Sequence, residues 1–264
     1  MINYMDKFRL NNKVAIVCGG LGLIGKEVSI SLAQAGAKVL VLDINIELGE
    51  KFQQNCFENN LNITFLKFDV SDFGSYDNYF SDLINKFGSV DTFVNATYPR
   101  TKDWGKKLEE VEIKSWQENI NIHLNSYCLL TRTIAELMKK NQMGGCIINY
   151  GSTYGVVGPD FNVYEGTDMT NQGEYAAIKG GIINFSRYVA SYYGKYNIRV
   201  NSICPGGVLA NQNETFLKNY NKRTPLRRMA NVDEIASATL FLASDAASYI
   251  TGTTFMVDGG WTSI

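Results

Sequence analysis

The sequence predicts an α/β fold, a Rossmann-type doubly wound parallel sheet of about seven strands with helices on both faces. Short β-branched runs bounded by Gly, Asn or Asp alternate with longer stretches of helical period along all 264 residues. Most of the runs are continuous in apolarity, which is typical of strands covered on both faces. Strand–helix alternation over a whole chain indicates parallel strands joined by crossover helices.

The alternation predicts seven strands and six main helices. The strands are VAIVC (14–18), KVLVLD (38–43), ITFLKF (63–68), DTFVNA (91–96), CIINY (146–150), IRVNSI (198–203) and TFMVD (254–258). The main helices are expected at 23–35, 45–59, 73–87, 113–140, 174–194 and 231–243. No linker, repeat or low-complexity segment interrupts the pattern, so we expect a single domain over residues 1–264.

Composition indicates an ordinary globular enzyme, with 45% apolar and 19% charged residues. A net charge of −1 provides no field that favours nucleic acid or an anionic membrane, and neither is expected as a partner. The five cysteines are odd in number and form no CxxC pair, so structural disulfides and a metal site are not predicted. With no apolar leader at the N-terminus, a reducing cytoplasm is the expected location.

A glycine-rich turn, GGLGLIG, separates the first expected strand from the first expected helix. Glycine lets the backbone turn sharply and approach a ligand closely. The helix start then presents unpaired N–H groups to an anion. A tight strand–helix connection would look similar, but the place of the turn after the first strand favours dinucleotide binding. The expected contacts with the cofactor are Gly19, Gly22, Leu23, Ile24 and Gly25.

A carboxylate ends the second expected strand. Asp43 follows the last glycine of the turn by 18 residues, where it can bind both adenosine ribose hydroxyls and would repel a 2′-phosphate. We therefore predict NAD rather than NADP, with a helix N-cap role for Asp43 as the alternative. Asp69 and Val70, after the third strand, and Asn95 and Ala96, at the end of the fourth, are expected near the adenosine.

Tyr175 and Lys179 lie four apart in GEYAAIKGG, near the start of an expected helix. That spacing puts them on one face of the helix. A nearby ammonium stabilises phenolate, so Tyr175 could pass a proton to or from a substrate oxygen. Ser152, in NYGSTYG after the fifth strand, adds a hydroxyl at the same sheet edge. Taken singly, the pair could be an ordinary helix surface and the serine a turn residue.

In their order along the chain, these features resemble the short-chain dehydrogenase/reductase family. The stretches IRVNSICPGG (198–207) and LFLASDAASYITGTTFMVDGGW (240–261) extend the resemblance over nearly the whole sequence. The resemblance implies NAD(H) chemistry and a homodimer or homotetramer. The glycine spacing departs from the single-domain pattern of the family and is similar to that of its sugar-nucleotide-modifying branch.

The resemblance also assigns roles to residues. Tyr175 is the acid/base, Lys179 binds the nicotinamide ribose and lowers the pKa of the tyrosine, and Ser152 hydrogen-bonds the reacting oxygen. Contacts with the nicotinamide are expected from Pro205, Gly206 and Val208.

Two long loops emerge at the edge of the expected sheet where substrate should lie. Residues 156–173 carry carboxylates, and TYPRTKDWGKK (97–107) carries four cations. This rim of both charge signs favours a hydroxyl-rich, anionic substrate bound by Arg100, with a solvated surface loop as the alternative. Together with GGLGLIGKE and IHLNSY, these loops resemble bacterial oxidoreductases of flagellin or surface-sugar modification, including those that make sialic-acid-like sugars.

His123 is the only histidine, and it lies on the apolar stripe of the expected helix 113–140. Counted from Trp116, it takes the place where the family commonly has a catalytic asparagine that links the lysine to solvent through a water. Imidazole can also donate and accept a proton. We expect a neutral His123 to replace the asparagine in a relay to Lys179, with a packed core histidine as the alternative.

The predicted function is an NAD-dependent oxidoreductase that interconverts a secondary alcohol and a ketone on a sugar or sugar derivative in surface-glycan biosynthesis. One alternative is an enzyme like 3-oxoacyl-carrier-protein reductase, against which Asp43 argues because NADPH would be usual there. The other is a non-catalytic NAD-binding regulator, against which the presence of both Tyr175 and Lys179 argues.

Overall fold

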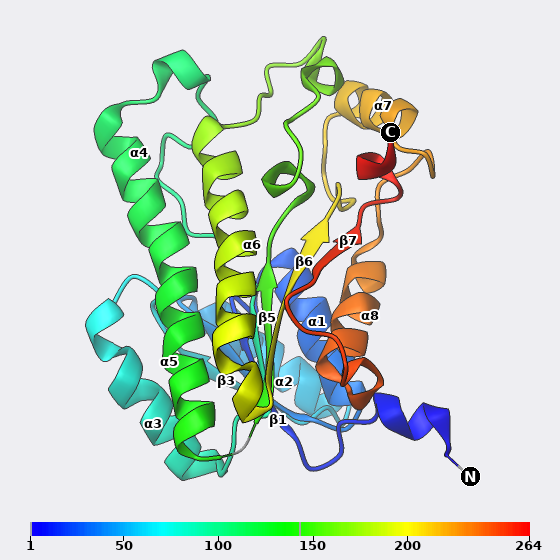
Figure 1. The fold of residues 1–264 in the computed structure, drawn as a ribbon. Coiled ribbons are helices and arrows are strands. Elements are labelled where there is room, and N and C mark those ends of the chain that lie inside the picture. The colour runs from blue at the N-terminus through cyan, green and yellow to red at the C-terminus, as the bar shows by residue number, and fades with distance from the viewer. Residues whose placement is uncertain (1, 143) are drawn as a thin grey trace.

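The computed structural model describes residues 2–142 and 144–264, and its core is a parallel sheet of seven strands (Figure 1). The strands are β1 Val14–Cys18, β2 Lys38–Asp43, β3 Ile63–Lys67, β4 Thr92–Asn95, β5 Gly145–Tyr150, β6 Ile198–Pro205 and β7 Thr254–Val257. Their spatial order is β3-β2-β1-β4-β5-β6-β7, with every neighbouring pair parallel. The predicted fold class is confirmed, and each expected strand is present: β1 and β2 have the expected bounds, and the ends of the others lie within two residues of those expected.

Helices cover both faces of the sheet. They are α1 Leu23–Gln34, α2 Ile46–Glu58, α3 Tyr76–Phe87, α4 Ile113–Asn119, α5 Ser126–Lys140, α6 Gly173–Tyr193, α7 Glu214–Arg223 and α8 Val232–Ala243. Buried residues of α1 and α8 pack on one face, and those of α3, α5 and α6 pack on the other. Of the helices in the described residues, none has both the length and the apolarity needed to cross a bilayer.

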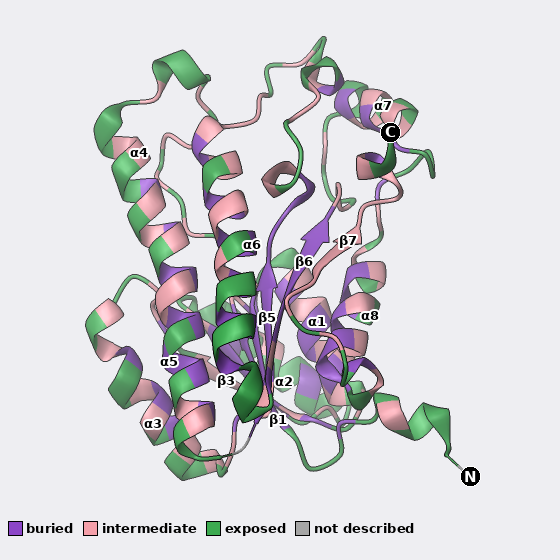
Figure 2. Ribbon diagram, viewed as in Figure 1, coloured by how far each residue is buried: buried purple, intermediate pink, exposed green. Residues whose placement is uncertain are grey.

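The uniform apolarity of the strands follows from this double cover. In β1, Ala15 and Val17 join the core beneath α1 and α8, whereas Ile16 and Cys18 join the core beneath α3 and α5. All five residues of β1 are buried, as Figure 2 shows for the strands at the centre of the sheet. Because successive side chains point to opposite faces, a strand that is packed against a core on each side has no polar face.

The five cysteines are free thiols.

Two helical features differ from expectation. The expected helix 113–140 is broken by a π turn, Ile120–Asn125, between α4 and α5. Helix α7 was not expected; it has few apolar residues, and those it buries are Phe216 and Tyr220. A π turn is rare and often marks a functional site, and α7 has only a narrow apolar face, so neither feature leaves a strong periodic signal in the sequence.

The strand order reverses between β1 and β4, because the chain runs outward through β2 and β3 and then crosses back. In open α/β sheets, ligands bind beyond the carboxyl ends of the strands at this point. The loops after β4, β5 and β6 lie at that edge, and α7 lies beyond the ends of β6 and β7 (Figure 1).

Candidate active site

A cleft in two halves lies beyond the carboxyl ends of the strands. One half, of about 500 Å³, is lined by the glycine turn and the ends of β2 and β3. The other, of about 470 Å³, is lined by the ends of β5 and β6, by α6 and by α7. The halves adjoin because three residues line both: Ala96, Thr97 and Tyr98.

The positions of the turn require glycine for different structural reasons. Gly19 has φ +75°, and a Cβ there would lie 2.8 Å from the backbone of Ala96. A Cβ on Gly25 would lie 2.2 Å from Gly19 O, so both positions are closed by the protein itself. A Cβ on Gly22 would meet only Gly19 O, at 3.5 Å, and would otherwise fill open space at the start of α1.

That open space fits a dinucleotide pyrophosphate. Gly22 is the N-cap of α1 and has no side chain to cap it, so the first N–H groups of the helix are left for an anion. Gly19 and Gly22 line the first half of the cleft and Ile24 lines the second. Leu23 lines neither half and is 51% exposed.

Asp43 lines the first half of the cleft, held by backbone amides. Its Oδ2 accepts from Leu21 N at 3.1 Å and its Oδ1 from Ile44 N at 2.8 Å. It does not cap α2, because the N-cap is Asn45, whose side chain accepts from Leu48 N. The carboxylate is therefore fixed at the wall of the cleft.

Asp69, Val70 and Ala96 line the same half, but Asn95 does not. Asn95 is fully buried, and its Oδ1 accepts from the hydroxyl of Thr97 at 2.8 Å. Its Nδ2 has no hydrogen-bond partner among the residues that the structure describes. Asn95 thus shapes the loop that follows β4.

The second half of the cleft brings together Ser152, Tyr175 and Lys179 with the expected nicotinamide contacts Pro205, Gly206 and Val208. Lys179 Nζ donates to Tyr150 O at 2.8 Å, and burial lowers the pKa of Lys179 to about 7. Nζ lies 5.8 Å from the centre of the Tyr175 ring. The tyrosine and lysine of α6 and the serine that follows β5 therefore face one cavity.

Burial raises the pKa of the Tyr175 phenol above its ordinary value, with the nearby phenol of Tyr98 acting in the same direction. The Ser152 hydroxyl acts in the opposite direction and only partly offsets it. The phenol is therefore protonated at neutral pH in this state of the protein, ready to donate its proton.

His123 lies in the π turn and is 0% exposed. Its ring packs between Tyr98 and Tyr127, at centroid distances of 5.3 and 5.6 Å. Neither ring nitrogen has a hydrogen-bond partner within residues 2–142 and 144–264. Burial, and then the charges of Lys179 and Arg100, hold the pKa of His123 well below its usual range, so the ring is neutral.

His123 does not line the cleft. The two rings that enclose it also lie near Lys179, whose Nζ is 5.9 Å from the ring centre of Tyr98 and 5.0 Å from that of Tyr127. His123 is thus separated from the lysine by aromatic side chains.

Arg100 is exposed, with its guanidinium 5.0 Å from the ring centre of Tyr98, and it lines neither half of the cleft. The loop 156–173 does reach the cavity, through Tyr164, Met169 and Asn171. Among the described residues that line this second half, Lys179 is the only acidic or basic side chain.

Sequence reasoning missed an aromatic wall. The side chains that line the second half of the cleft and were not expected there include Tyr98, Tyr127, Tyr154, Tyr164, Phe216 and Tyr220. The spacing of four between the last two was a usable signal for a helix face. Tyr127 lies on α5, on the same apolar stripe as His123. Nothing local marked Tyr98, Tyr154 and Tyr164, because the segments that carry them meet only in the folded protein. In the described part of the chain, no group of His, Cys, Asp and Glu clusters as a metal site.

Known proteins match this chain over nearly its whole length. The family model described as Enoyl-(Acyl carrier protein) reductase matches residues 22–262. Post-translational flagellin modification protein A of Campylobacter coli is 34% identical over 256 residues, covering 96% of this chain and 99% of that protein.

Two solved structures have the same fold. A short chain dehydrogenase from Leptospira borgpetersenii serovar Hardjo-bovis, with bound NAD+, superposes with a TM-score of 0.83 at 30% identity, covering 99% of this chain and 96% of that one. A gluconate 5-dehydrogenase from Burkholderia cenocepacia J2315, in complex with NADP and tartrate, gives a TM-score of 0.88 at 25% identity, covering 99% and 100%. The two neighbours differ in the cofactor they bind.

Proposed function

Because the chain belongs to the short-chain dehydrogenase/reductase family, which uses NAD(P), we propose that it is an NAD-dependent oxidoreductase acting on a sugar or sugar derivative. It interconverts a secondary alcohol and a ketone. The observation that carries this proposal is the cavity shared by Ser152, Tyr175 and Lys179, which adjoins the glycine turn through Ala96–Tyr98. We also propose that residues 1–264 act as one domain and that the enzyme is a homodimer or homotetramer.

Tyr175 is the proton-transfer group. When bound, nicotinamide supplies or accepts the hydride at the carbinol carbon. In the direction of reduction, the Tyr175 phenol, which burial keeps protonated, donates its proton to the ketone oxygen. In the direction of oxidation, the phenolate takes the hydroxyl proton as the hydride leaves the carbon.

Ser152 and Lys179 orient the reacting groups. The Ser152 hydroxyl lines the cavity beside Tyr175 and binds the substrate oxygen. Lys179 is anchored by Tyr150 O, which leaves its other N–H groups for the ribose of the cofactor. Its charge, when present, favours the phenolate form of Tyr175.

NAD is proposed over NADP because of Asp43. Its carboxylate is held by two backbone amides at the wall of the adenosine half of the cleft. A 2′-phosphate placed there would meet a fixed negative charge, whereas two ribose hydroxyls would each find an acceptor.

His123 is proposed as a proton relay between Lys179 and solvent. Support comes from its neutral state and from its two buried ring nitrogens, which are without partners in the described chain. A water could join such a nitrogen to the lysine side of the aromatic pair. Core packing between Tyr98 and Tyr127 stays the alternative.

A sugar in surface-glycan biosynthesis is proposed from the likeness to a flagellin modification protein and from the hydroxyl-rich aromatic wall. Arg100 is proposed to bind an anionic group of that substrate at the rim. An activity like that of 3-oxoacyl-carrier-protein reductase is the second candidate, which the 35% identity over 257 residues to such an enzyme of Chlamydia trachomatis favours and Asp43 disfavours.

One screen tests these candidates. Sugar phosphates, nucleotide sugars, nonulosonates and a 3-oxoacyl thioester are offered with NAD(H) and NADP(H), and reduced nicotinamide is followed by absorbance. We expect turnover with a sugar derivative and NAD(H). Turnover of the thioester alone would replace the proposed function with the second candidate, and NAD binding without any turnover would favour the regulator.

A further inference from the structure

Glu174 and Asn119 form a buried contact beside the acid/base. Glu174 directly precedes Tyr175 and is 2% exposed, and Asn119 ends α4 just before the π turn and is 0% exposed. Asn119 Nδ2 donates to Glu174 Oε1 at 3.3 Å, across 55 residues of sequence. The contact therefore joins the start of the catalytic helix to the end of α4, directly before the π turn that carries His123.

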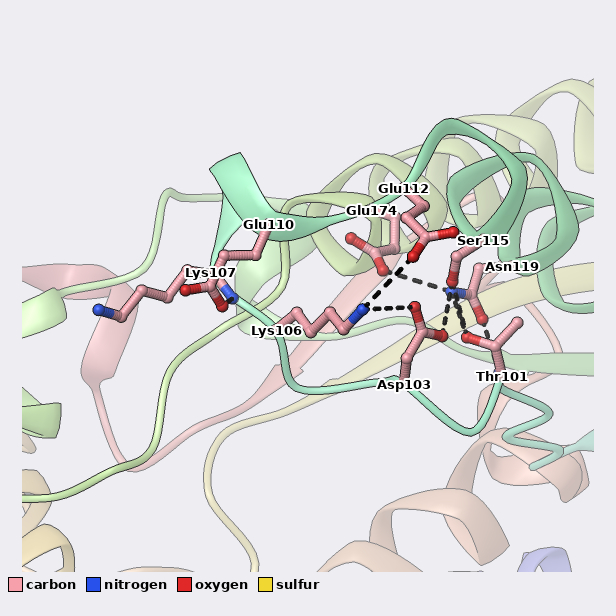
Figure 3. A network of polar contacts seen from close by, with 9 residues as sticks. All are labelled: Thr101, Asp103, Lys106, Lys107, Glu110, Glu112, Ser115, Asn119 and Glu174. Carbon is pink, nitrogen blue, oxygen red and sulfur yellow. Dashed lines mark hydrogen bonds and ion pairs between the residues drawn. The ribbon is translucent and has the colours of Figure 1, made fainter.

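Asn119 also fastens the loop that follows β4 (Figure 3). Its Oδ1 accepts from Thr101 N at 2.9 Å, and its Nδ2 donates to Thr101 Oγ1 at 2.9 Å. One turn earlier in α4, Ser115 donates to Asp103 Oδ1 at 2.7 Å and lies 3.1 Å from Thr101 Oγ1. One amide side chain thus holds three segments together: the loop 97–107, α4 and α6.

The loop 97–107, which Asn119 holds in place, brings two aromatic side chains against Tyr175. The ring centroids of Tyr98 and Trp104 lie 6.0 and 6.2 Å from that of Tyr175, and they lie 5.8 Å from each other. Tyr98 lines both halves of the cleft. A displacement of the loop would therefore change the shape of the cavity at the reacting atoms.

If its only role were packing, the contact between Asn119 and Glu174 would lower the stability of the fold. Glu174 Oε2 is buried and has no hydrogen-bond partner in the described chain. A buried carboxylate oxygen without a partner destabilises a fold, even where the positive end of a helix dipole offsets part of the cost. An apolar residue would fill the site without that loss, so stability does not explain a carboxylate here.

We propose that Asn119 and Glu174 are positioning residues for the reaction: through the loop 97–107 they hold Tyr98 and Trp104 against Tyr175 and set the shape of the substrate side of the cleft. For its kinetic consequence, the inference rests on the proposed function. Small displacements of groups around reacting atoms cost rate out of proportion to their size.

The test exchanges the two partners. Asn119→Asp places a second carboxylate against Glu174 and removes the donated hydrogen bond, so kcat/KM should fall by roughly tenfold or more. In the double variant Asn119→Asp with Glu174→Gln, the glutamine amide donates to the new aspartate, and kcat/KM should return to within about threefold of the parent. The Kd for NADH should change much less than kcat/KM in both, since Gly19, Gly22 and Asp43 of the adenosine half lie outside the loop that Asn119 fastens.

Asn201→Asp is the matched control. Asn201 is equally buried, donates to Ile250 O at 3.0 Å and accepts from Thr253 N at 3.1 Å, but it does not line the cleft. This variant should lose stability and keep kcat/KM. It separates loss of positioning from general weakening of the fold.

Amide hydrogen exchange provides a readout that needs no substrate. Exchange at Thr101 and its neighbours should accelerate in Asn119→Asp, recover in the double variant and stay unchanged in Asn201→Asp. If Asn119→Asp does not fold, Thr101→Val takes its place, because it removes the hydroxyl that Asn119 donates to. It should lower kcat/KM and accelerate exchange in the same direction as Asn119→Asp, but by a smaller factor.

The outcomes are separable. A folded Asn119→Asp protein with kcat/KM within about twofold of the parent, or a double variant without recovery, overturns the positioning role. If the parent enzyme turns over no alcohol or ketone, the proposed function fails instead, and unchanged exchange at Thr101 would then overturn the inference separately.

Discussion

Tyr98 lies edge-on against Tyr175, with ring centroids 6.0 Å apart and ring planes at 82°. Edge-to-face packing is favourable for aromatic rings. The relationship ties the loop after β4 to the catalytic helix at the residue that moves the proton. It also places Tyr98 where the two halves of the cleft meet.

Substitution of Tyr98 tests the importance of this ring. Tyr98→Ala removes a wall of the cavity, so kcat/KM should fall by about tenfold or more, whereas Tyr98→Phe keeps the ring and should stay within about threefold. Steady-state kinetics with the substrate found by screening measures both. Equal losses in the two variants would show that the hydroxyl, not the ring, matters.

Asp43 should set cofactor choice. The parent enzyme should bind NADH at least about tenfold more tightly than NADPH, a difference of about 1.4 kcal/mol. Asp43→Asn removes the charge but keeps an oxygen that can accept from Leu21 N, so it should narrow this ratio. Side-by-side fluorescence titrations provide the measurement. Equal or tighter NADPH binding by the parent enzyme would remove the basis for the NAD assignment.

Tyr175→Phe should abolish turnover while leaving the Kd for NADH nearly unchanged. Only the hydroxyl is lost, and loss of a proton-transfer group typically costs on the order of 10²–10⁴-fold in rate. Lys179→Ala should weaken NADH binding as well, because it removes the donor held by Tyr150 O. If the Tyr175→Phe protein keeps most of its activity, the assigned mechanism is wrong.

His123 should contribute a single acidic limb to the pH–rate profile. Because its pKa lies well below its usual range, the limb should appear well below pH 6.5, where the ring becomes protonated and can no longer relay. His123→Asn should keep turnover and remove that limb. An identical profile in the variant would leave His123 as a core-packing residue.

Lys179 should make the unfolding free energy of the cofactor-free protein depend on pH. Its pKa falls from 10.5 to about 7 on folding, so between these values the unfolded chain binds more protons than the native one. Stability contributed through this group should therefore rise with pH above about 7. Lys179→Met, which keeps the stem, should flatten the rise. Urea unfolding from about pH 7 to about pH 9 measures it, below the range where tyrosines titrate.

Much of the fold follows from local pattern. A strand buried on both faces is apolar at most of its positions. Apolar runs bounded by Gly, Asn or Asp predicted all seven strands, and the pattern is fullest in Val14–Cys18 and Lys38–Asp43. The spacing of four put Tyr175 and Lys179 on one helix face, and both line the same cavity. The strain at Gly19 and the closeness of Gly25 to Gly19 O explain two glycines that the sequence marked as a turn.

The sequence by itself determined the order of strands and helices, the turn at the start of α1, and the residue types that carry the chemistry. These are encoded within a few residues, by burial pattern and backbone freedom. Only the tertiary structure decided that Tyr98 meets Tyr175, that Asn119 reaches Glu174, and that α7 closes one side of the cleft. Such contacts join segments far apart in the chain, and they arise because parallel strands bring their carboxyl ends, and the loops that follow, to one edge of the sheet.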